Sequence, residues 1–157
     1  MQTIKPFLWF DDNAEEAVNF YTSIFKDSKI LSISRYGEGG MGQPGKVMTV
    51  SFQLNGLELT ALNGGPIFKF TEAISLAVSV VTQEEVDRLW ESLSAGGEKG
   101  QCGWLKDKYG LSWQIVPTAL FELMQKGDAD QSKRVTQAML KMTKLDIAGL
   151  KKAFDQK

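Results

Sequence analysis

Apolar residues recur at helical spacing in two similar segments of the chain. Residues 13–21 and 82–90 each begin with a residue that can cap a helix, and two acidic residues follow in the expected first turn. Acidic side chains at that point suit the positive end of a helix dipole. The apolar positions are Ala17, Phe20, Tyr21 and Ile24 in the first segment and Val86, Leu89, Trp90 and Leu93 in the second. This pattern predicts two amphipathic helices.

Strand-like sequence flanks both predicted helices in the same order. A short apolar stretch precedes each helix, at residues 4–10 and 74–81, and further strand-like sequence follows it. The two repeats end in similar segments, GLELT at residues 56–60 and GLSWQ at residues 110–114. The sequence therefore predicts two copies of a unit with the order strand, helix and several strands.

Within the predicted strands, apolar residues alternate with small or polar ones. In the last strand of the second repeat, Leu111, Trp113 and Ile115 alternate with Ser112 and Gln114. The apolar face of such a strand needs a layer to pack on, and the helices supply it. The other faces carry few Lys or Glu residues, which favours a curved sheet that encloses a groove. An ordinary solvent-facing sheet is the alternative.

Several polar and aromatic side chains are expected at this groove. Those on the polar strand faces are Gln114, Ser112, Thr60, Glu58 and Ser75, and those near the mouth are Trp104, Phe68 and Phe70. Their side chains are short or neutral except that of Glu58, which suits a modest, mostly uncharged ligand held by a few hydrogen bonds and aromatic contact. Glu58 is the leading candidate for an acid or base, with a salt bridge at the rim as the alternative. For Phe68 and Phe70, packing in the core is the alternative.

Residues 118–157 differ from the rest of the chain because they carry eight basic and only five acidic residues. Thr118 is expected to cap a first helix that ends before Gly127. Two further groups of apolar residues follow helical spacing, the second after the capping Asp146: Val135, Ala138, Met139 and Met142, then Ile147, Leu150 and Phe154. We expect a helical tail whose charge lies on solvated helix faces.

Composition excludes several kinds of chemistry. The 157 residues carry a formal net charge of −1, so no basic surplus favours nucleic-acid binding. The sequence contains no histidine, which removes the commonest metal ligand and the commonest general base. Cys102 is the only cysteine, so an internal disulfide and a zinc site built from cysteines are excluded. Neither a signal peptide nor a membrane-spanning segment is recognisable, and a cytoplasmic protein is expected.

Two local motifs match functional patterns, but their surroundings do not support those functions. Residues 37–42 match the dinucleotide-binding pattern GxGxxG, yet Pro44, Gly45 and a predicted strand follow instead of a helix. We expect a mobile hairpin loop that is dispensable for folding. Cys102 has Lys99 and Lys106 nearby in sequence but no histidine partner. A small structural residue in a strand is favoured over a reactive thiolate.

Five segments together resemble the PhnB-like, demethylubiquinone methyltransferase-like branch of the vicinal-oxygen-chelate (VOC), or glyoxalase/bleomycin-resistance, superfamily. They are PFLWFD at 6–11, AEEAVNFY at 14–21, ALNGG at 61–65, FKF at 68–70 and GLSWQIVP at 110–117. The resemblance extends over nearly the whole chain, the tail included. It implies an α+β fold in which two paired βαβββ modules form a cupped mixed sheet with C-terminal helices. The single domain, 1–157, would comprise module one at about 1–65, module two at about 73–117 and the tail at 118–157.

The resemblance also implies where a metal site would lie. The metal enzymes of the superfamily place His, Gln or Glu ligands on the first and last strands of each module. Those positions correspond to Pro6 or Phe7, Thr60, Ser75 and Gln114. Only Gln114 is a suitable ligand, and one neutral amide does not hold a divalent cation. We therefore expect no metal and no other cofactor, and the chain lacks the glycine-rich turn that a nucleotide-bearing methyl donor requires.

Three functions remain open at the level of sequence. The preferred one is a metal-free small-molecule binding protein whose ligand is unknown. The alternatives are a metal-independent enzyme that acts on a small metabolite through Glu58, Cys102 or Gln114, and an interaction or regulatory protein with a vestigial cavity. The expected partners are a second copy of the chain in a homodimer and the small molecule, with neither nucleic acid nor membrane.

Overall fold

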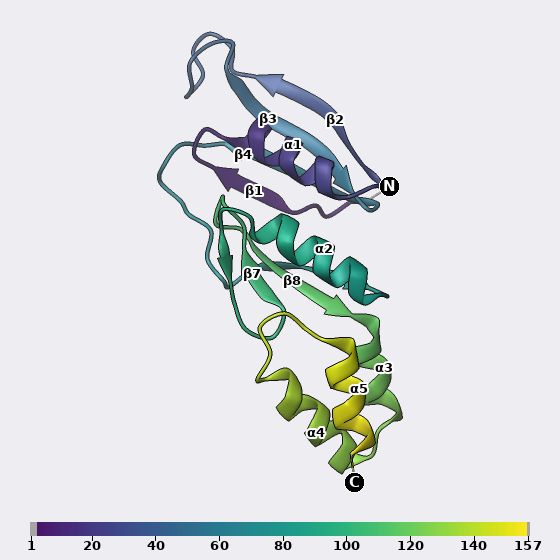
Figure 1. The fold of residues 1–157 in the computed structure, drawn as a ribbon. Helices are drawn as coiled ribbons and strands as arrows, with labels where there is room; N and C mark the ends of the chain where they lie inside the picture. Colours follow the sequence, from purple (N-terminus) through teal and green to yellow (C-terminus); the bar gives the residue numbers. More distant parts are fainter. Residues whose placement is uncertain (1–2, 157) are drawn as a thin grey trace. The chain divides into compact units, whose positions relative to one another are not determined.

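The fold was described from a computed structural model that covers residues 3–156 (Figure 1). The chain divides between Phe70 and Thr71 into two compact units. Unit one comprises the described residues up to Phe70, and unit two those from Thr71 onward. Each unit has the order strand, helix, three strands, which confirms the predicted α+β class with two βαβββ modules. Within residues 3–156, no helix combines the length and the apolarity needed to cross a bilayer.

Unit one forms a four-stranded mixed sheet with one helix on it. Its elements are β1 (Phe7–Phe10), α1 (Ala14–Ile24), β2 (Ser28–Arg35), β3 (Val47–Leu54) and β4 (Leu57–Asn63). The strand order is β1-β4-β3-β2, with β1 parallel to β4 and the other neighbours antiparallel. Tyr21 of α1 stacks on Phe52, with ring centroids 6.4 Å apart. Phe52 and its cross-strand neighbour Leu59 therefore define the face that α1 covers.

Helix α1 begins where it was predicted, but another residue caps it. The side chain of Asn13 makes no capping hydrogen bond. Instead Asn63, at the end of β4, accepts a hydrogen bond from the Ala14 backbone N–H through Oδ1 at 2.8 Å. The same side chain donates from Nδ2 to the Val47 carbonyl at 3.0 Å. One amide thus joins the start of the helix to two strands, which a local capping pattern does not reveal.

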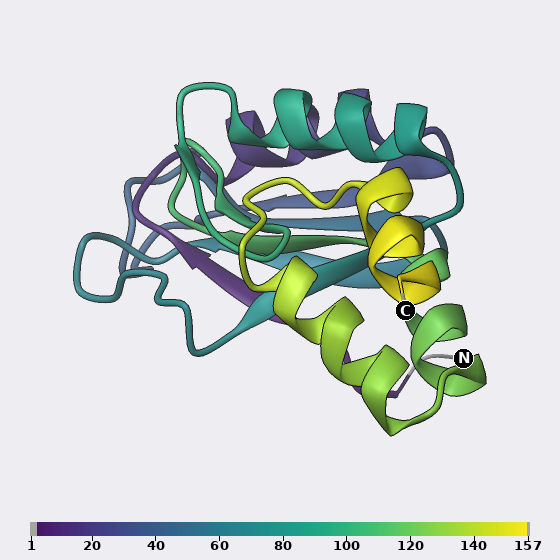
Figure 2. The same ribbon diagram turned by 60° about the horizontal axis from the view of Figure 1, so that its bottom comes forward.

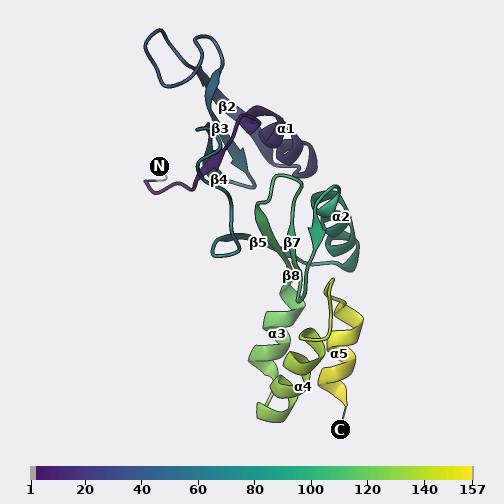
Figure 3. The same cartoon turned by 90° about the vertical axis from the view of Figure 1, so that its left-hand side faces the viewer.

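Unit two repeats the arrangement and adds a helical tail. Its sheet elements are β5 (Ser75–Val80), α2 (Gln83–Ser94), β6 (Glu98–Lys99), β7 (Trp104–Lys106) and β8 (Ser112–Pro117). The strand order is β5-β8-β7-β6, with β5 parallel to β8. Thr82 caps α2 as predicted, because its hydroxyl accepts from the Glu85 backbone N–H. Helix α2 lies along one face of the sheet (Figure 3), where Leu105, Trp113 and Ile115 are buried.

Asp107 organises the turn between β7 and β8. The residue is buried, with 2% of its surface exposed. Oδ1 accepts hydrogen bonds from the backbone N–H groups of Tyr109 and Leu111, at 2.8 and 3.1 Å. Oδ2 accepts from Nε1 of Trp113 at 2.9 Å. Because these bonds close the turn and hold the first part of β8, they fix the register in which β8 pairs with β7.

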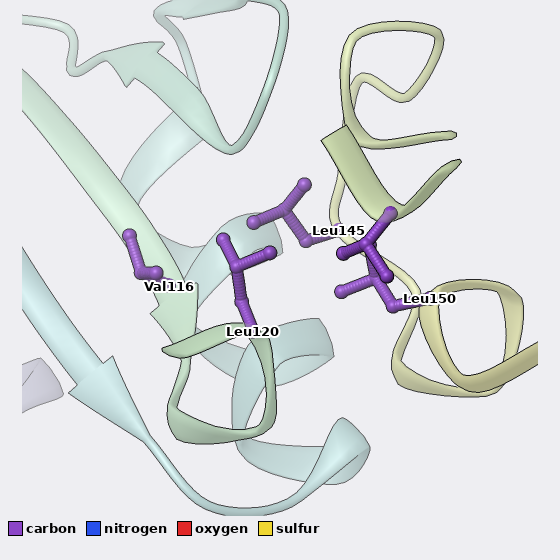
Figure 4. Packing of buried hydrophobic residues seen from close by; sticks show 5 residues of the cluster. Val116, Leu120, Leu145 and Leu150 are labelled. Atoms are coloured by element: carbon purple, nitrogen blue, oxygen red, sulfur yellow. The ribbon is translucent and has the colours of Figure 1, made fainter. Parts of the chain in front are cut away.

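The tail consists of the predicted helices, with two differences at their ends. They are α3 (Thr118–Lys126), α4 (Ala129–Met139) and α5 (Ile147–Asp155), seen side by side in Figure 2. Pro117, and not Thr118, occupies the N-cap position of α3. Helix α4 ends at Met139, so Met142 lies beyond it, although it still packs on the tail core. That core contains Val116, Leu120, Val135, Leu145 and Leu150 (Figure 4).

The segment between α4 and α5 attaches the tail to the rest of unit two. The backbone N–H groups of Cys102 and Gly103 donate to the carbonyls of Met142 and Thr143, at 2.8 and 2.7 Å. Cys102 has a φ of 56° and lies in the turn before β7. The expectation of a strand residue was therefore wrong. Cys102 is a left-handed turn residue whose backbone N–H holds the tail, and this structural role does not require a reactive thiol.

Candidate functional site

The open face of the unit-two sheet, which is the face away from α2, brings together four of the residues predicted to bind a ligand. Strand register aligns two rows of side chains across it. The first row, from β6 to β5, is Glu98, Lys106, Ser112 and Ser75. The second is Trp104, Gln114 and Ala77, with the backbone of Gly100 hydrogen-bonded to Trp104 at its end. Ser75, Ser112, Gln114 and Trp104 thus share one surface.

A hydrogen bond between side chains joins the two rows at their centre. Nε2 of Gln114 donates to Oγ of Ser75 at 2.9 Å, and both residues are half-buried. An amide can donate two hydrogen bonds and accept two, so this bond leaves Gln114 with capacity for a ligand. The bond to Ser75 orients the amide on the open face and leaves part of its hydrogen-bonding capacity for a further partner.

A pocket of about 190 Å³ includes Trp104, Lys106, Ser112 and Glu72 in its lining. Ser112 is 1% exposed. Its hydroxyl has no hydrogen-bond partner among the residues that the structure describes. Buried hydroxyl groups are normally bonded, and leaving one without a partner costs about 1–3 kcal/mol. Ser112 is therefore a buried polar group of this face whose hydrogen-bonding capacity the described residues do not use.

Lys106 is held by carboxylates at the edge of the pocket. Its ammonium forms an ion pair with Glu72 and lies 3.9 Å from Oε2 of Glu98. The hydrogen bond between the two side chains lowers the pKa of Glu72 and raises the pKa of Lys106. A lysine that is held protonated in this way does not take a proton from a neighbouring hydroxyl at neutral pH. Lys106 therefore does not serve as a base that would make Ser112 a nucleophile.

In unit one, Thr60 and Glu58 lie on the face of β4 away from α1, because the alternate residue Leu59 faces the helix. Thr60 pairs with Phe7 of β1. Glu58 forms an ion pair with Lys5. Of the two interpretations of Glu58, the salt bridge at the rim is the one present in the structure.

The two phenylalanines after β4 point to opposite faces of the unit-one sheet. Phe68 packs edge-on against Trp9, with ring centroids 5.0 Å apart, on the face that carries Thr60. Phe70 packs against Phe10 at 5.1 Å, and Phe10 is buried on the helix side. Phe68 is therefore the one placed beside the predicted polar residues of unit one, whereas Phe70 contributes to the core.

Sequence reasoning missed a larger cleft, of about 860 Å³, in unit one. Its walls come from the start of α1 and from the hairpin loop between β2 and β3. The charged lining residues are Asp11, Asp12, Glu15, Arg35 and Lys46. Tyr36 anchors the loop by donating from its hydroxyl to the Asn63 carbonyl at 2.6 Å. The glycine-rich segment supplies part of this lining, and its expected mobility stays a prediction.

The positions that the resemblance assigns to metal ligands carry side chains that do not suit a divalent cation. Register pairs Thr60 with Phe7 and not with Pro6. Phe7, Thr60, Ser75 and Gln114 offer a phenyl ring, two hydroxyls and one neutral amide. Across residues 3–156, no group of three or more Cys, Asp or Glu side chains is placed to hold a metal ion. A divalent cation prefers carboxylate or imidazole ligands, so this donor set does not fit one.

Comparisons with known proteins identify relatives of the first part of the chain. Residues 2–116 match the family described as 3-demethylubiquinone-9 3-methyltransferase. No curated protein sequence matches the chain. A solved structure of a putative 3-demethylubiquinone-9 3-methyltransferase, PhnB protein, from Bacillus cereus is 43% identical, with a TM-score of 0.68. That alignment covers 74% of this chain and 99% of the Bacillus chain.

Two more distant structures share the fold. A protein from Pseudomonas aeruginosa is 20% identical with a TM-score of 0.63, over 74% of this chain and 98% of its own. The fosfomycin resistance protein FosX from Listeria monocytogenes, complexed with Mn(II) and sulfate, is 19% identical with a TM-score of 0.54. It aligns over 80% of this chain and 98% of its own. The family match ends at residue 116, so α3–α5 lie outside it, and the expectation that the resemblance includes the tail stays a prediction.

Proposed function

Because this chain belongs to the 3-demethylubiquinone-9 3-methyltransferase family, the PhnB-like branch of the VOC superfamily, we propose that it binds an uncharged small molecule without a metal ion. The binding surface is the open face of the unit-two sheet. The observation that carries this proposal is the Gln114–Ser75 pair, which presents a neutral amide at the centre of that face. Trp104, directly across from Gln114 on β7, adds an aromatic surface. Neutral hydrogen-bonding groups beside an aromatic ring are typical of sites for small organic molecules.

The family name does not decide the reaction, because one fold supports many activities. A nucleotide-bearing methyl donor is commonly held by a glycine-rich turn between a strand and a helix. The turn between β1 and α1 is Asp-Asp-Asn, and the turn between β5 and α2 is Val-Thr. Neither contains glycine, so the proposal is for binding and not for methyl transfer.

Removing metal ions should leave ligand binding unchanged. We expect elemental analysis of the purified protein to find far less than one transition metal ion per chain, since the inherited positions carry Phe7, Thr60, Ser75 and Gln114. A ligand found by screening should bind with the same affinity before and after treatment with a chelator. If the treated protein loses binding and added Mn(II) or Zn(II) restores it, the metal-free proposal is wrong.

Replacing Gln114 with leucine should weaken binding without unfolding the protein. A thermal-shift screen of small metabolites first identifies a ligand, since a molecule that binds only the native state raises the melting temperature. In Gln114→Leu, affinity for that ligand should fall by about 1–3 kcal/mol, because a hydrogen-bonding group of the ligand loses its partner. Gln125→Leu, at an exposed position of α3, is the matched control and should bind normally. A screen without any stabilising molecule would count against the proposed function.

A further inference from the structure

Ser112 occupies the middle of the open face of unit two, yet the polar groups around it are already bonded to one another. Ser75, beside it on β5, accepts the hydrogen bond of Gln114. Lys106, beside it on β7, is paired with Glu72. Ser112 is 1% exposed, and its hydroxyl has no partner in residues 3–156. The residue also belongs to the lining of the 190 Å³ pocket. A group from a ligand in that pocket would complete its bonding.

Trp104 supplies an aromatic wall to the same pocket. It is half-buried, and Gly100 lies beside it on the outer side of the sheet, with its N–H bonded to the Trp104 carbonyl at 2.8 Å. A Cβ atom at position 100 would come within 2.7 Å of that carbonyl oxygen, so the position does not accept a side chain without a shift of the backbone. The indole therefore has no side-chain neighbour at Gly100, and part of it is left for contact with a ligand.

The charges around the pocket are compensated within the protein. Lys106 is paired with Glu72 and lies near Glu98. Lys99, a further lining residue, forms an ion pair with Glu91 at 2.7 Å. Because each ammonium has a carboxylate partner, a charged ligand would have to compete with an existing ion pair. An uncharged ligand meets no such competition.

Pocket size limits the ligand further. An apolar cavity of about 150 Å³ is large enough to hold a benzene ring. The pocket beside Ser112, at about 190 Å³, accommodates a single six-membered ring with one small substituent. The hydroxyl of Ser112 can both donate and accept, so the substituent can be an alcohol or a carbonyl oxygen.

We propose that this pocket, lined by Ser112 and Trp104, is a subsite for one uncharged aromatic ring that carries a hydrogen-bonding oxygen. The ring packs against the indole of Trp104, and its oxygen bonds to the Ser112 hydroxyl. This inference rests on the proposed function, because it names the class of ligand that the open face of unit two binds.

Two probes of nearly equal shape test the proposal in the full-length protein. 4-Fluorophenol carries a hydroxyl where 4-fluorotoluene carries a methyl group, and fluorine NMR measures the binding of both. We expect the wild-type protein to bind 4-fluorophenol about tenfold more tightly, since only this probe satisfies the buried hydroxyl. In Ser112→Ala that preference should vanish through weaker binding of 4-fluorophenol. Trp104→Leu should weaken both probes, and Ser79→Ala, an exposed serine on the same strand face as Ser75, should change neither.

Each result has a definite meaning for the subsite. If the wild-type protein binds the two probes with equal affinity, the proposal is overturned. This outcome needs no variant, so the test remains decisive even if Ser112→Ala folds poorly. A preference for 4-fluorophenol that persists in Ser112→Ala also overturns it. If neither probe binds at about 10 mM, a concentration that detects very weak ligands, the subsite is refuted. In that case a metabolite whose binding depends on Gln114 would still support the proposed function, whereas the absence of any such metabolite would refute both.

Discussion

Replacing Asp107 with alanine should lower the free energy of unfolding of unit two by about 3–5 kcal/mol, because each buried donor left without an acceptor costs about 1–3 kcal/mol. The carboxylate accepts hydrogen bonds from Tyr109, Leu111 and Trp113, so three donors lose their partner in one substitution. Urea unfolding followed by tryptophan fluorescence measures the change. Trp90, Trp104 and Trp113 all belong to unit two, whereas only Trp9 belongs to unit one.

Two variants make this experiment specific to the geometry of the turn. Asp107→Asn keeps an oxygen that accepts from the two backbone N–H groups and loses only the bond to Trp113, because an NH₂ group replaces the second oxygen. Its effect on the free energy of unfolding should therefore be smaller than that of alanine. Asp155→Ala, at an exposed position of α5, should change stability by less than about 0.5 kcal/mol. A loss below about 1 kcal/mol in Asp107→Ala would show that the turn does not depend on this carboxylate.

Truncating Leu145 to alanine should destabilise unit two by about 2–5 kcal/mol, the usual cost of such a change in a packed core. Leu145 is fully buried and packs with Val116, Leu120, Val135 and Leu150 (Figure 4). Its side chain also lies close to Gly103, where an added Cβ atom would come within 3.2 Å of it. The loss should appear in thermal unfolding followed by far-ultraviolet circular dichroism, because the tail contributes three helices to that spectrum.

Leu140 provides a matched control for this substitution. It has the same side chain, lies only five residues earlier and is 60% exposed at the end of α4. Leu140→Ala should therefore cost well under 1 kcal/mol, about the effect of an ordinary surface change. Equal effects of the two substitutions would mean that the tail core does not contribute to the stability of unit two.

Elements with a local physical signature could be predicted from the sequence. Helical spacing and acidic first turns located α1 and α2. The alternation of apolar and small residues located β3 and β8. Predictions were wrong where a residue distant in the sequence decides the outcome. Asn63 caps α1 in place of Asn13, because strand β4 ends beside the start of the helix. Cys102 leaves the strand because its backbone N–H bonds to the tail.

The candidate site was predictable as a set of residues but not as a geometry. Strand periodicity is enough to place Ser112 and Gln114 on one face. It does not show that Gln114 bonds to Ser75 while Ser112 is left without a partner, since that difference depends on register and rotamer. The cleft of unit one escaped prediction because loops build most of it, and loops have no periodicity.

The backbone hydrogen bonds from Cys102 and Gly103 to Met142 and Thr143 allow detachment of the tail to be measured at two residues outside it. The two donating amides lie in the turn directly before Trp104, but their acceptors lie in the segment between α4 and α5. Each detachment of that segment would expose these two amide protons to solvent exchange while the β7–β8 ladder stays closed. Deuterium uptake at Cys102 and Gly103 would therefore record the opening frequency of a segment some forty residues away in the sequence.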